Sequence, residues 1–150
     1  MENMSKEKAK LIIGDLVSKF DKGKAFYKST GYKEANLEDD FLKPFLKALN
    51  WNISNEGIHR AADREVIVQA KGRDGKEPDY LLQLDQRPCF YIEAKHPRFK
   101  LHHEVSYMWQ AYSYAYSTQS SSDRKKVDFS LLTDFEEFRF FDCTFKADLK

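Results

Sequence analysis

Three short apolar runs that follow one another closely constrain the fold of this chain most. They are REVIVQA from Arg64, DYLLQLD from Asp79 and CFYIEAK from Cys89, and all three are rich in the aliphatic and aromatic residues that favour strands. The connection DQRP between the second and third runs is short enough for a hairpin, and a polar, glycine-containing stretch precedes the second run. The pattern predicts three consecutive antiparallel strands.

Helical patterns lie on both sides of these strands. Apolar residues recur at helical spacing over residues 9–20, and again from Asn36 to Leu49, where Pro44 removes a backbone donor and predicts a kink. A third helix is expected over residues 103–118, followed by two strands in DFSLLTD and EEFRFFDC. The expected order is α, α, β, β, β, α, β, β, which predicts an α/β fold with a mixed sheet flanked by helices.

The composition permits one domain and excludes several classes of protein. With 150 residues, 41% of them hydrophobic, and no long linker, residues 1–150 are expected to form a single domain. Lys and Arg number 25 against 24 Asp and Glu, and the net charge of +1 gives no polyelectrolyte signature. There is no signal peptide or long apolar run, and Cys89 and Cys143 are isolated, so a soluble cytoplasmic protein with buried free thiols is expected.

The third apolar run ends in two opposite charges, Glu93 and Lys95. Alternation places both side chains on one face of the strand, and a hairpin would bring Asp79 beside them. Two neighbouring carboxylates repel one another unless a cation lies between them, and such oxygen ligands suit Mg²⁺ or Mn²⁺. Lys95 could then position a water. The alternative is an ion pair of Lys95 with Glu93 or Asp79 at a sheet edge.

These residues resemble a known family. The stretch PDYLLQLDQRPCFYIEAK is similar to the signature of the PD-(D/E)XK nuclease superfamily, with Asp79, Glu93 and Lys95 at the motif positions. The similarity extends, in order, over LVSKF, GYKEANLEDDFLKPFLKALNWNISN, the REV at Arg64, WQAYSYAYS and LLTDFEEFRFFDCT. Together these stretches resemble the N-terminal nuclease domain of Type IIG restriction-modification enzymes, to which the nuclease domain of type I restriction R subunits is related.

That resemblance implies a restriction-endonuclease-like fold and a fragment of a larger chain. A helical extension over residues 1–33 would precede a core over residues 34–145, and methyltransferase and specificity domains would follow in the full-length chain. Asp79, Glu93 and the Ala94 carbonyl would hold Mg²⁺, for which Mn²⁺ would substitute. Lys95 would orient the attacking water, and hydrolysis of double-stranded DNA would leave a 5′-phosphate.

The resemblance also implies supporting residues. Glu34 matches the acidic residue of the family's E-a-x-x-R pattern and would join the metal site, and regular helical spacing would place it within about 20° of the core-facing Phe41. Glu38 stands where the pattern has Arg, and it competes with Glu34 for this role. Gln110 and Tyr114 match the Q-x-x-x-Y motif near the site and the DNA backbone. His96, which replaces a common Lys, would contact a phosphate or support the site.

One face of the third helix is expected to be core, and it carries Val105, Met108, Trp109, Tyr112 and Tyr116. The sequence as a whole predicts a metal-dependent endodeoxyribonuclease domain of a restriction-modification enzyme. Two alternatives remain. One is a non-catalytic DNA-binding or scaffolding module of the same fold, and the other is a stand-alone nuclease that acts on DNA ends or junctions.

Overall fold

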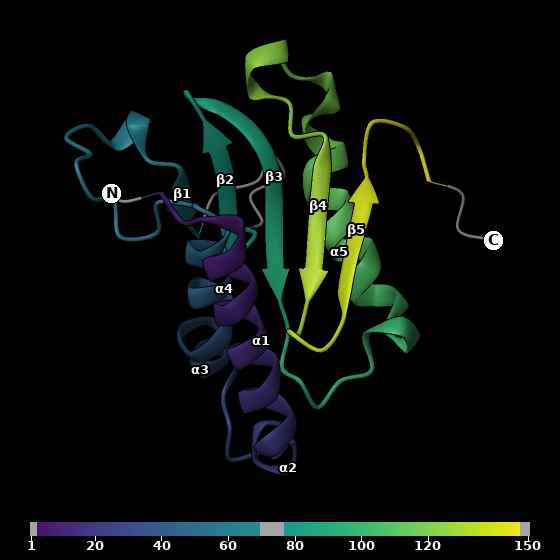
Figure 1. Cartoon of the computed structure of the whole chain (residues 1–150). Coiled ribbons are helices and arrows are strands. Elements are labelled where there is room, and N and C mark those ends of the chain that lie inside the picture. Colours follow the sequence, from purple (N-terminus) through teal and green to yellow (C-terminus); the bar gives the residue numbers. More distant parts are fainter. Residues whose placement is uncertain (1–2, 70–76, 148–150) are drawn as a thin grey trace.

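In the computed structural model, the first three predicted strands form one half of a five-stranded sheet (Figure 1). The structure describes residues 3–69 and 77–147. Strands β1 (Val66–Val68), β2 (Tyr80–Leu84) and β3 (Arg87–Ala94) pair antiparallel in chain order. The three-stranded meander is therefore confirmed. Ala70, the last residue of the first predicted run, lies outside the described residues.

The turn between β2 and β3 explains how the hairpin is so short. Its two residues, Asp85 and Gln86, both have positive φ values, of 49° and 65°. A two-residue turn with both residues in the left-handed region has a twist that matches the twist of the flanking strands. The hairpin sets the register of the pairs next to the turn, and a bulge between Leu82 and Gln83 then shifts it by one residue, so that Tyr80 faces Ile92 near the far end of the pair.

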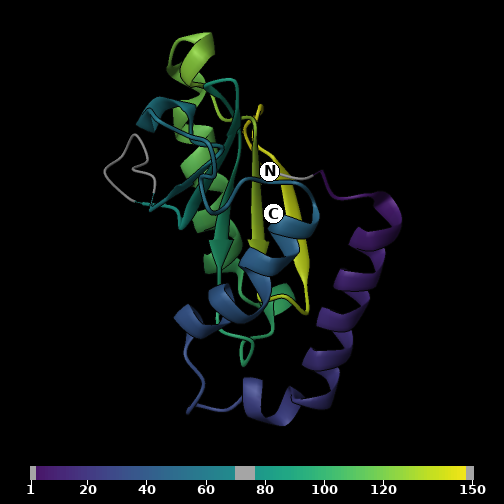
Figure 2. The same cartoon turned by 60° about the vertical axis from the view of Figure 1, so that its left-hand side comes forward.

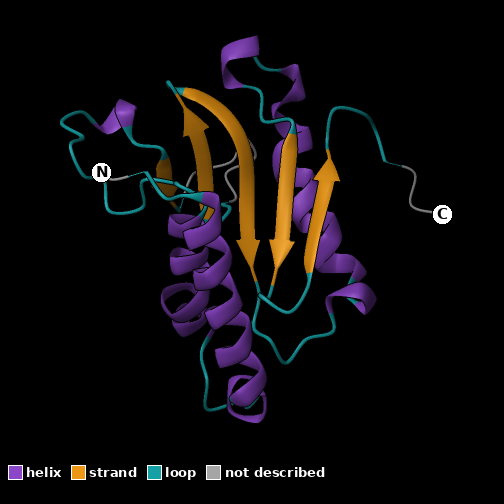
Figure 3. Ribbon diagram, in the orientation of Figure 1, coloured by secondary structure: helices purple, strands orange, loops and turns teal. Residues whose placement is uncertain are grey.

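The remaining two strands follow a helical crossover. Helix α5 (Val105–Tyr116) connects β3 to β4 (Phe129–Thr133), which pairs parallel with β3, and β5 (Phe138–Asp142) pairs antiparallel with β4 (Figure 3). The sheet order is β1-β2-β3-β4-β5, so the sheet is mixed, as expected. Short 3₁₀ segments lie in the connections, at Ala61–Asp63, Leu101–His103, Ser117–Ser120 and Asp123–Lys125.

The N-terminal helices cover the other face of the sheet. Helix α1 (Lys6–Lys22) begins after Ser5, whose hydroxyl accepts a hydrogen bond from the Lys8 N–H, and the short helix α2 (Lys24–Tyr27) follows it. Figure 2 shows α5 on one side of the sheet and α4 (Lys43–Ala48) with α1 on the other. The protein therefore has three layers.

The second helical segment is less regular than expected. It comprises α3 (Glu34–Leu37), the π-helical segment η1 (Glu38–Leu42) and α4 without a break. The Lys43 N–H reaches back five residues to the Glu38 carbonyl. Pro44 has no N–H for the Asp40 carbonyl, and its ring would press on that carbonyl in a regular helix, so the widened turn relieves this contact.

The hydrophobic core lies on both faces of the sheet. One cluster lies between α4 and the sheet and comprises Leu42, Leu46, Val66, Tyr80, Leu82, Ile92, Ala94 and Leu131. A second lies under α5 and includes Tyr91, Tyr114, Ala115 and Cys143. Both cysteines are free, but Cys89 is only half-buried. No helix in the described part of the chain is long and apolar enough to cross a membrane.

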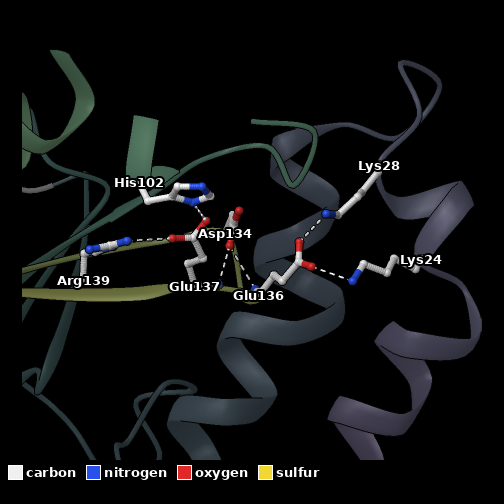
Figure 4. A network of polar contacts seen from close by, with 7 residues as sticks. All are labelled: Lys24, Lys28, His102, Asp134, Glu136, Glu137 and Arg139. Carbon is white, nitrogen blue, oxygen red and sulfur yellow. Dashed lines mark hydrogen bonds and ion pairs between the residues drawn. The ribbon is translucent and has the colours of Figure 1, made fainter. Parts of the chain in front are cut away.

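The turn between β4 and β5 is built around the buried Asp134. One oxygen of Asp134, Oδ1, accepts hydrogen bonds from the N–H groups of Glu136 (2.9 Å) and Glu137 (2.7 Å) (Figure 4). The other, Oδ2, is buried and has no partner among the described residues. Because this oxygen is desolvated, burial raises the pKa of Asp134 to about 6, although the two N–H groups act against it.

The side chains of this turn join two distant segments. Glu136 pairs with Lys24 at 2.6 Å and with Lys28, and Glu137 accepts a hydrogen bond from His102 at 2.8 Å (Figure 4). The lysines belong to the N-terminal helices, whereas His102 belongs to the segment after β3. The turn therefore links the N-terminal helical region to the segment that follows β3.

Candidate active site

The hairpin brings Asp79 to the end of β3. Because Tyr80 pairs with Ile92, Asp79 lies directly across from Glu93, one position beyond that pair. The Asp79 Oδ2 atom accepts a hydrogen bond from the Ala94 N–H at 2.7 Å, and the Asp79 carbonyl accepts one from the Gln69 N–H. These contacts fix the Asp79 carboxylate beside the strand end.

Glu93 and Lys95 form an ion pair at the same place. The Lys95 Nζ lies 2.9 Å from Glu93 Oε1, and the two side chains are only 13% and 7% exposed. The Lys95 ammonium also lies 4.6 Å from the centre of the Tyr107 ring, and its backbone N–H donates to the Thr133 carbonyl at 2.9 Å. The structure thus brings Asp79, Glu93 and Lys95 together.

The charges in this group are unevenly balanced. Burial, together with the Asp79 charge, raises the pKa of Glu93 to about 7, although Lys95 opposes the shift. Burial also raises the pKa of Asp79, against the effects of the Ala94 N–H and Lys95. For Lys95, burial lowers the pKa, but the hydrogen bond and charge of Glu93 outweigh it and the net shift is upward. One ammonium therefore faces two desolvated carboxylates.

The residues present fit a divalent cation with few protein ligands. Glu93 Oε2 is buried and has no hydrogen-bond partner among residues 3–69 and 77–147. Over the same residues, no group of three His, Cys, Asp or Glu side chains could hold a metal by itself. Mg²⁺ commonly binds through one or two carboxylates and keeps its other positions for water and substrate phosphates, so Asp79 and Glu93 suit it.

Glu34 approaches the group from α3, of which it is the first residue. Its Oε2 atom accepts a hydrogen bond from the His96 N–H at 3.1 Å. Burial raises the pKa of Glu34, Lys95 lowers it, and the Asp79 charge raises it further. The Glu34 carboxylate is therefore close enough to interact electrostatically with Lys95 and Asp79.

Glu38 contacts the first residue of β2. Its Oε2 atom accepts a hydrogen bond from the Tyr80 hydroxyl at 2.8 Å, and burial raises its pKa. The charges that act on Lys95 are those of Glu93, Glu34 and Asp79. Geometry thus favours Glu34, but the helical spacing from Glu34 to Phe41 does not support the choice, because that path crosses the π-helical segment η1.

His96 is buried next to the site, and backbone groups hold its ring. It is 8% exposed; its Nε2 atom lies 2.6 Å from the Tyr32 carbonyl oxygen, and its Nδ1 accepts a hydrogen bond from the Arg98 N–H at 3.0 Å. These partners assign a neutral ring with the proton on Nε2. Both ring nitrogens are occupied by backbone groups, so the expected phosphate contact is not open to His96.

Helix α5 closes the other side of the centre. The Gln110 Nε2 donates to the Tyr114 hydroxyl at 2.8 Å, and Tyr114 is buried. Burial and then the Glu93 charge raise the pKa of Tyr114, which places this hydroxyl within electrostatic reach of the carboxylates. Both residues of the Q-x-x-x-Y motif therefore lie beside the centre.

The expected core-facing side of α5 is confirmed only in part. Tyr112 is buried and Met108 packs against a core cluster, whereas Val105, Trp109 and Tyr116 are 56%, 42% and 37% exposed. Tyr114 and its neighbour Ala115, which were not assigned to that side, are also buried. The Thr133 and Tyr32 carbonyls could not be foreseen, because backbone contacts leave no trace in residue type.

The chain is similar to proteins of restriction systems. Residues 59–148 match the family described as type I restriction enzyme R protein N terminus. The type II restriction enzyme and methyltransferase RM.Eco57I of Escherichia coli is 28% identical over 134 residues, which cover 86% of this chain and 13% of that protein. No solved structure matches the chain at a significant level.

The matched region includes Asp79, Glu93, Lys95, Gln110 and Tyr114, whereas Glu34 precedes it. It contains the whole sheet and α5, which together form most of the candidate site. The chain therefore belongs to the family of the type I restriction enzyme R protein N terminus.

Proposed function

We propose that this chain is a metal-dependent endodeoxyribonuclease domain that hydrolyses phosphodiester bonds of double-stranded DNA. The observation that carries the proposal is the grouping of Asp79, Glu93 and Lys95 at the end of β3, where Glu93 Oε2 is buried without a partner in the described part of the chain. Membership in a restriction-enzyme family supports a nuclease-type role. A pure binding module would gain nothing from buried carboxylates that repel phosphate.

Each residue has a distinct task in this proposal. Asp79 and Glu93, with the Ala94 carbonyl, would hold Mg²⁺ or Mn²⁺, which supplies charge neutralisation for the phosphate that is attacked. Lys95 stays protonated because Glu93 keeps its pKa raised. Its ammonium orients the attacking water and offsets negative charge in the transition state. Glu34 adds negative charge that keeps Lys95 in place.

The chain spans only 13% of the length of the relative that it matches. That relative is named as a restriction enzyme and methyltransferase in one protein. We propose that this domain likewise works with methyltransferase and specificity domains of a Type IIG-like restriction-modification enzyme. Recognition of a DNA sequence would lie in those domains.

The decisive test is Lys95→Ala in the full-length enzyme. Cleavage in the presence of Mg²⁺ should fall on the order of a hundredfold or more, because one preorganised electrostatic group is lost. DNA affinity should change little, since Lys95 is only one charge. Lys125→Ala is a matched control, because Lys125 is exposed and lies outside the site. Cleavage rates with Mg²⁺, with Mn²⁺ and with a chelator would be compared for all three proteins.

A full-length Lys95→Ala enzyme that cuts at the wild-type rate would remove the catalytic role. Residues Glu93 and Lys95 would then be an ion-paired strand end in a binding module. A chain that cuts free ends or junctions without any further domain would instead favour the stand-alone nuclease.

A further inference from the structure

A groove along α5 lies next to Lys95. It has a volume of about 340 Å³ and is lined by Ser106, Tyr107, Trp109, Gln110, Ser113 and Tyr114. Two of these residues also interact with the candidate active site. The Tyr107 ring lies 4.6 Å from the Lys95 ammonium, and the Glu93 charge acts on the Tyr114 hydroxyl. A ligand in the groove would therefore lie next to a phosphate held at the centre.

The lining of the groove is uncharged. All six side chains are aromatic, hydroxyl or amide groups. A phosphate would be expected at cationic groups, as in the larger cavity of about 650 Å³ around Arg87, Arg124 and Lys126 at the opposite end of β3. Rings combined with hydroxyl and amide groups instead suit a nucleobase and its sugar, which offer a flat face and hydrogen-bonding edges.

Trp109 is held in place before any ligand binds. Its ring stacks on Tyr112 with centroids 5.3 Å apart, and Tyr112 stacks on Tyr116 at 5.2 Å. The Tyr112 hydroxyl donates to the Phe145 carbonyl and accepts from the Ala147 N–H, at 2.6 and 2.8 Å. Because this stack is anchored, a base that packs on Trp109 would not have to order the ring, which lowers the entropic cost of binding.

Hydrogen-bonding groups remain available at the groove. Gln110 uses its Nε2 for the Tyr114 hydroxyl, and within the described residues neither Gln110 Oε1 nor the Tyr107 hydroxyl has a partner. Gln110 Oε1 offers a hydrogen-bond acceptor, and the Tyr107 hydroxyl offers a donor. The edges of nucleobases require both.

We propose that this groove binds the unstacked base and the sugar of one nucleotide beside the phosphodiester that is cut, with Trp109 as the stacking surface. The inference rests on the proposed nuclease function and narrows its substrate. The double-stranded DNA that is cut must therefore open locally, so that one base of the cut strand lies outside the stack.

The test uses the fluorescence of Trp109 to report binding at the groove. The chain has two tryptophans, so Trp51→Phe leaves Trp109 as the only one. Without divalent metal and at low salt, a short single-stranded oligonucleotide should quench its fluorescence, and the same oligonucleotide made of abasic sites should not. Trp109→Leu should weaken binding of the normal oligonucleotide by on the order of tenfold, whereas Trp109→Phe should weaken it less. Phe140→Leu, at an aromatic residue 57% exposed on β5, is the control and should leave binding unchanged.

Equal quenching by the abasic oligonucleotide, or wild-type affinity in Trp109→Leu, would overturn the base-binding groove. Neither result would affect the nuclease proposal, which depends on cleavage and Lys95. If the wild-type chain bound no oligonucleotide at all and the full-length enzyme did not cut DNA, both proposals would fail.

Discussion

At the scale of single residues, Glu93 and Lys95 show how much a strand pattern can predict about the positions of side chains. Alternation in CFYIEAK and the short hairpin were enough to predict that Asp79, Glu93 and Lys95 converge, and the structure places them together. The sequence could not show that Glu93 Oε2 lacks a partner among the residues that the structure describes, because that depends on tertiary packing. The same limit applies to His96, because the Tyr32 carbonyl that contacts its ring is 64 residues away in the sequence.

Asp134 gives a residue-scale prediction about stability and pH. Burial raises its pKa from 3.8 to about 6, so the folded protein binds this proton more tightly than the unfolded chain does. Its contribution to stability is therefore full below about pH 4 and is lost as the pH rises through about 6. Asp134→Asn keeps the acceptor for the Glu136 and Glu137 N–H groups but removes the buried charge.

We expect Asp134→Asn to raise the free energy of unfolding at about pH 7.5 by roughly 1–3 kcal/mol, and to change it little near pH 4. Urea unfolding followed by circular dichroism across this range measures the difference. A difference that did not vary with pH would contradict the assignment of a buried carboxylate.

At the scale of elements, the strands were more predictable than the helices. Short alternating runs with tight connections specify both strand and register, and β1 to β5 lie where they were expected. The π-helical segment η1 was missed because its cause, Pro44, acts on a carbonyl four residues upstream and no residue pattern marks the wider turn. The core-facing side of α5 was predicted only in part, because aromatic residues occur on both sides of this helix.

Helix α1 provides an element-scale prediction. It joins the fold through Phe20, which is 3% exposed and packs against the rings of Tyr27, Phe41 and Phe135. Phe20→Ala should lower the free energy of unfolding by roughly 3–5 kcal/mol, because it leaves a cavity in this aromatic cluster. Leu11→Ala on the same helix is the control, since Leu11 is 72% exposed and should change stability by less than about 0.5 kcal/mol. Similar losses for both variants in urea unfolding would show that α1 is not attached through Phe20.

At the scale of the whole molecule, charge is nearly balanced. A net charge of +1 offers little general attraction for DNA, so affinity must come from local contacts near the site or from other domains. Composition therefore excluded a strongly basic DNA-binding protein, but it could not locate the partner surfaces. The order of elements and the mixed sheet were predictable because most strands and helices carry a clear residue pattern of their own.

We expect the chain by itself to bind duplex DNA weakly, with a Kd on the order of 10⁻⁴ to 10⁻⁶ M, and without sequence preference. Affinity should fall steeply between about 50 and about 200 mM salt. Fluorescence anisotropy with two unrelated duplexes measures both properties. Tight binding to one of the two would show that recognition resides in this chain.

The parallel pairing of β3 with β4 also sets the order in which the site can be assembled during synthesis. Asp79 and Glu93 belong to one hairpin, and both have been made once the ribosome has passed Lys95. The carbonyl that holds the Lys95 N–H belongs to Thr133, beyond α5, and the turn that joins the flanking segments comes after it. Since translation runs from the N-terminus, a nascent chain that has not reached Thr133 has both carboxylates but lacks the contact that holds the Lys95 backbone.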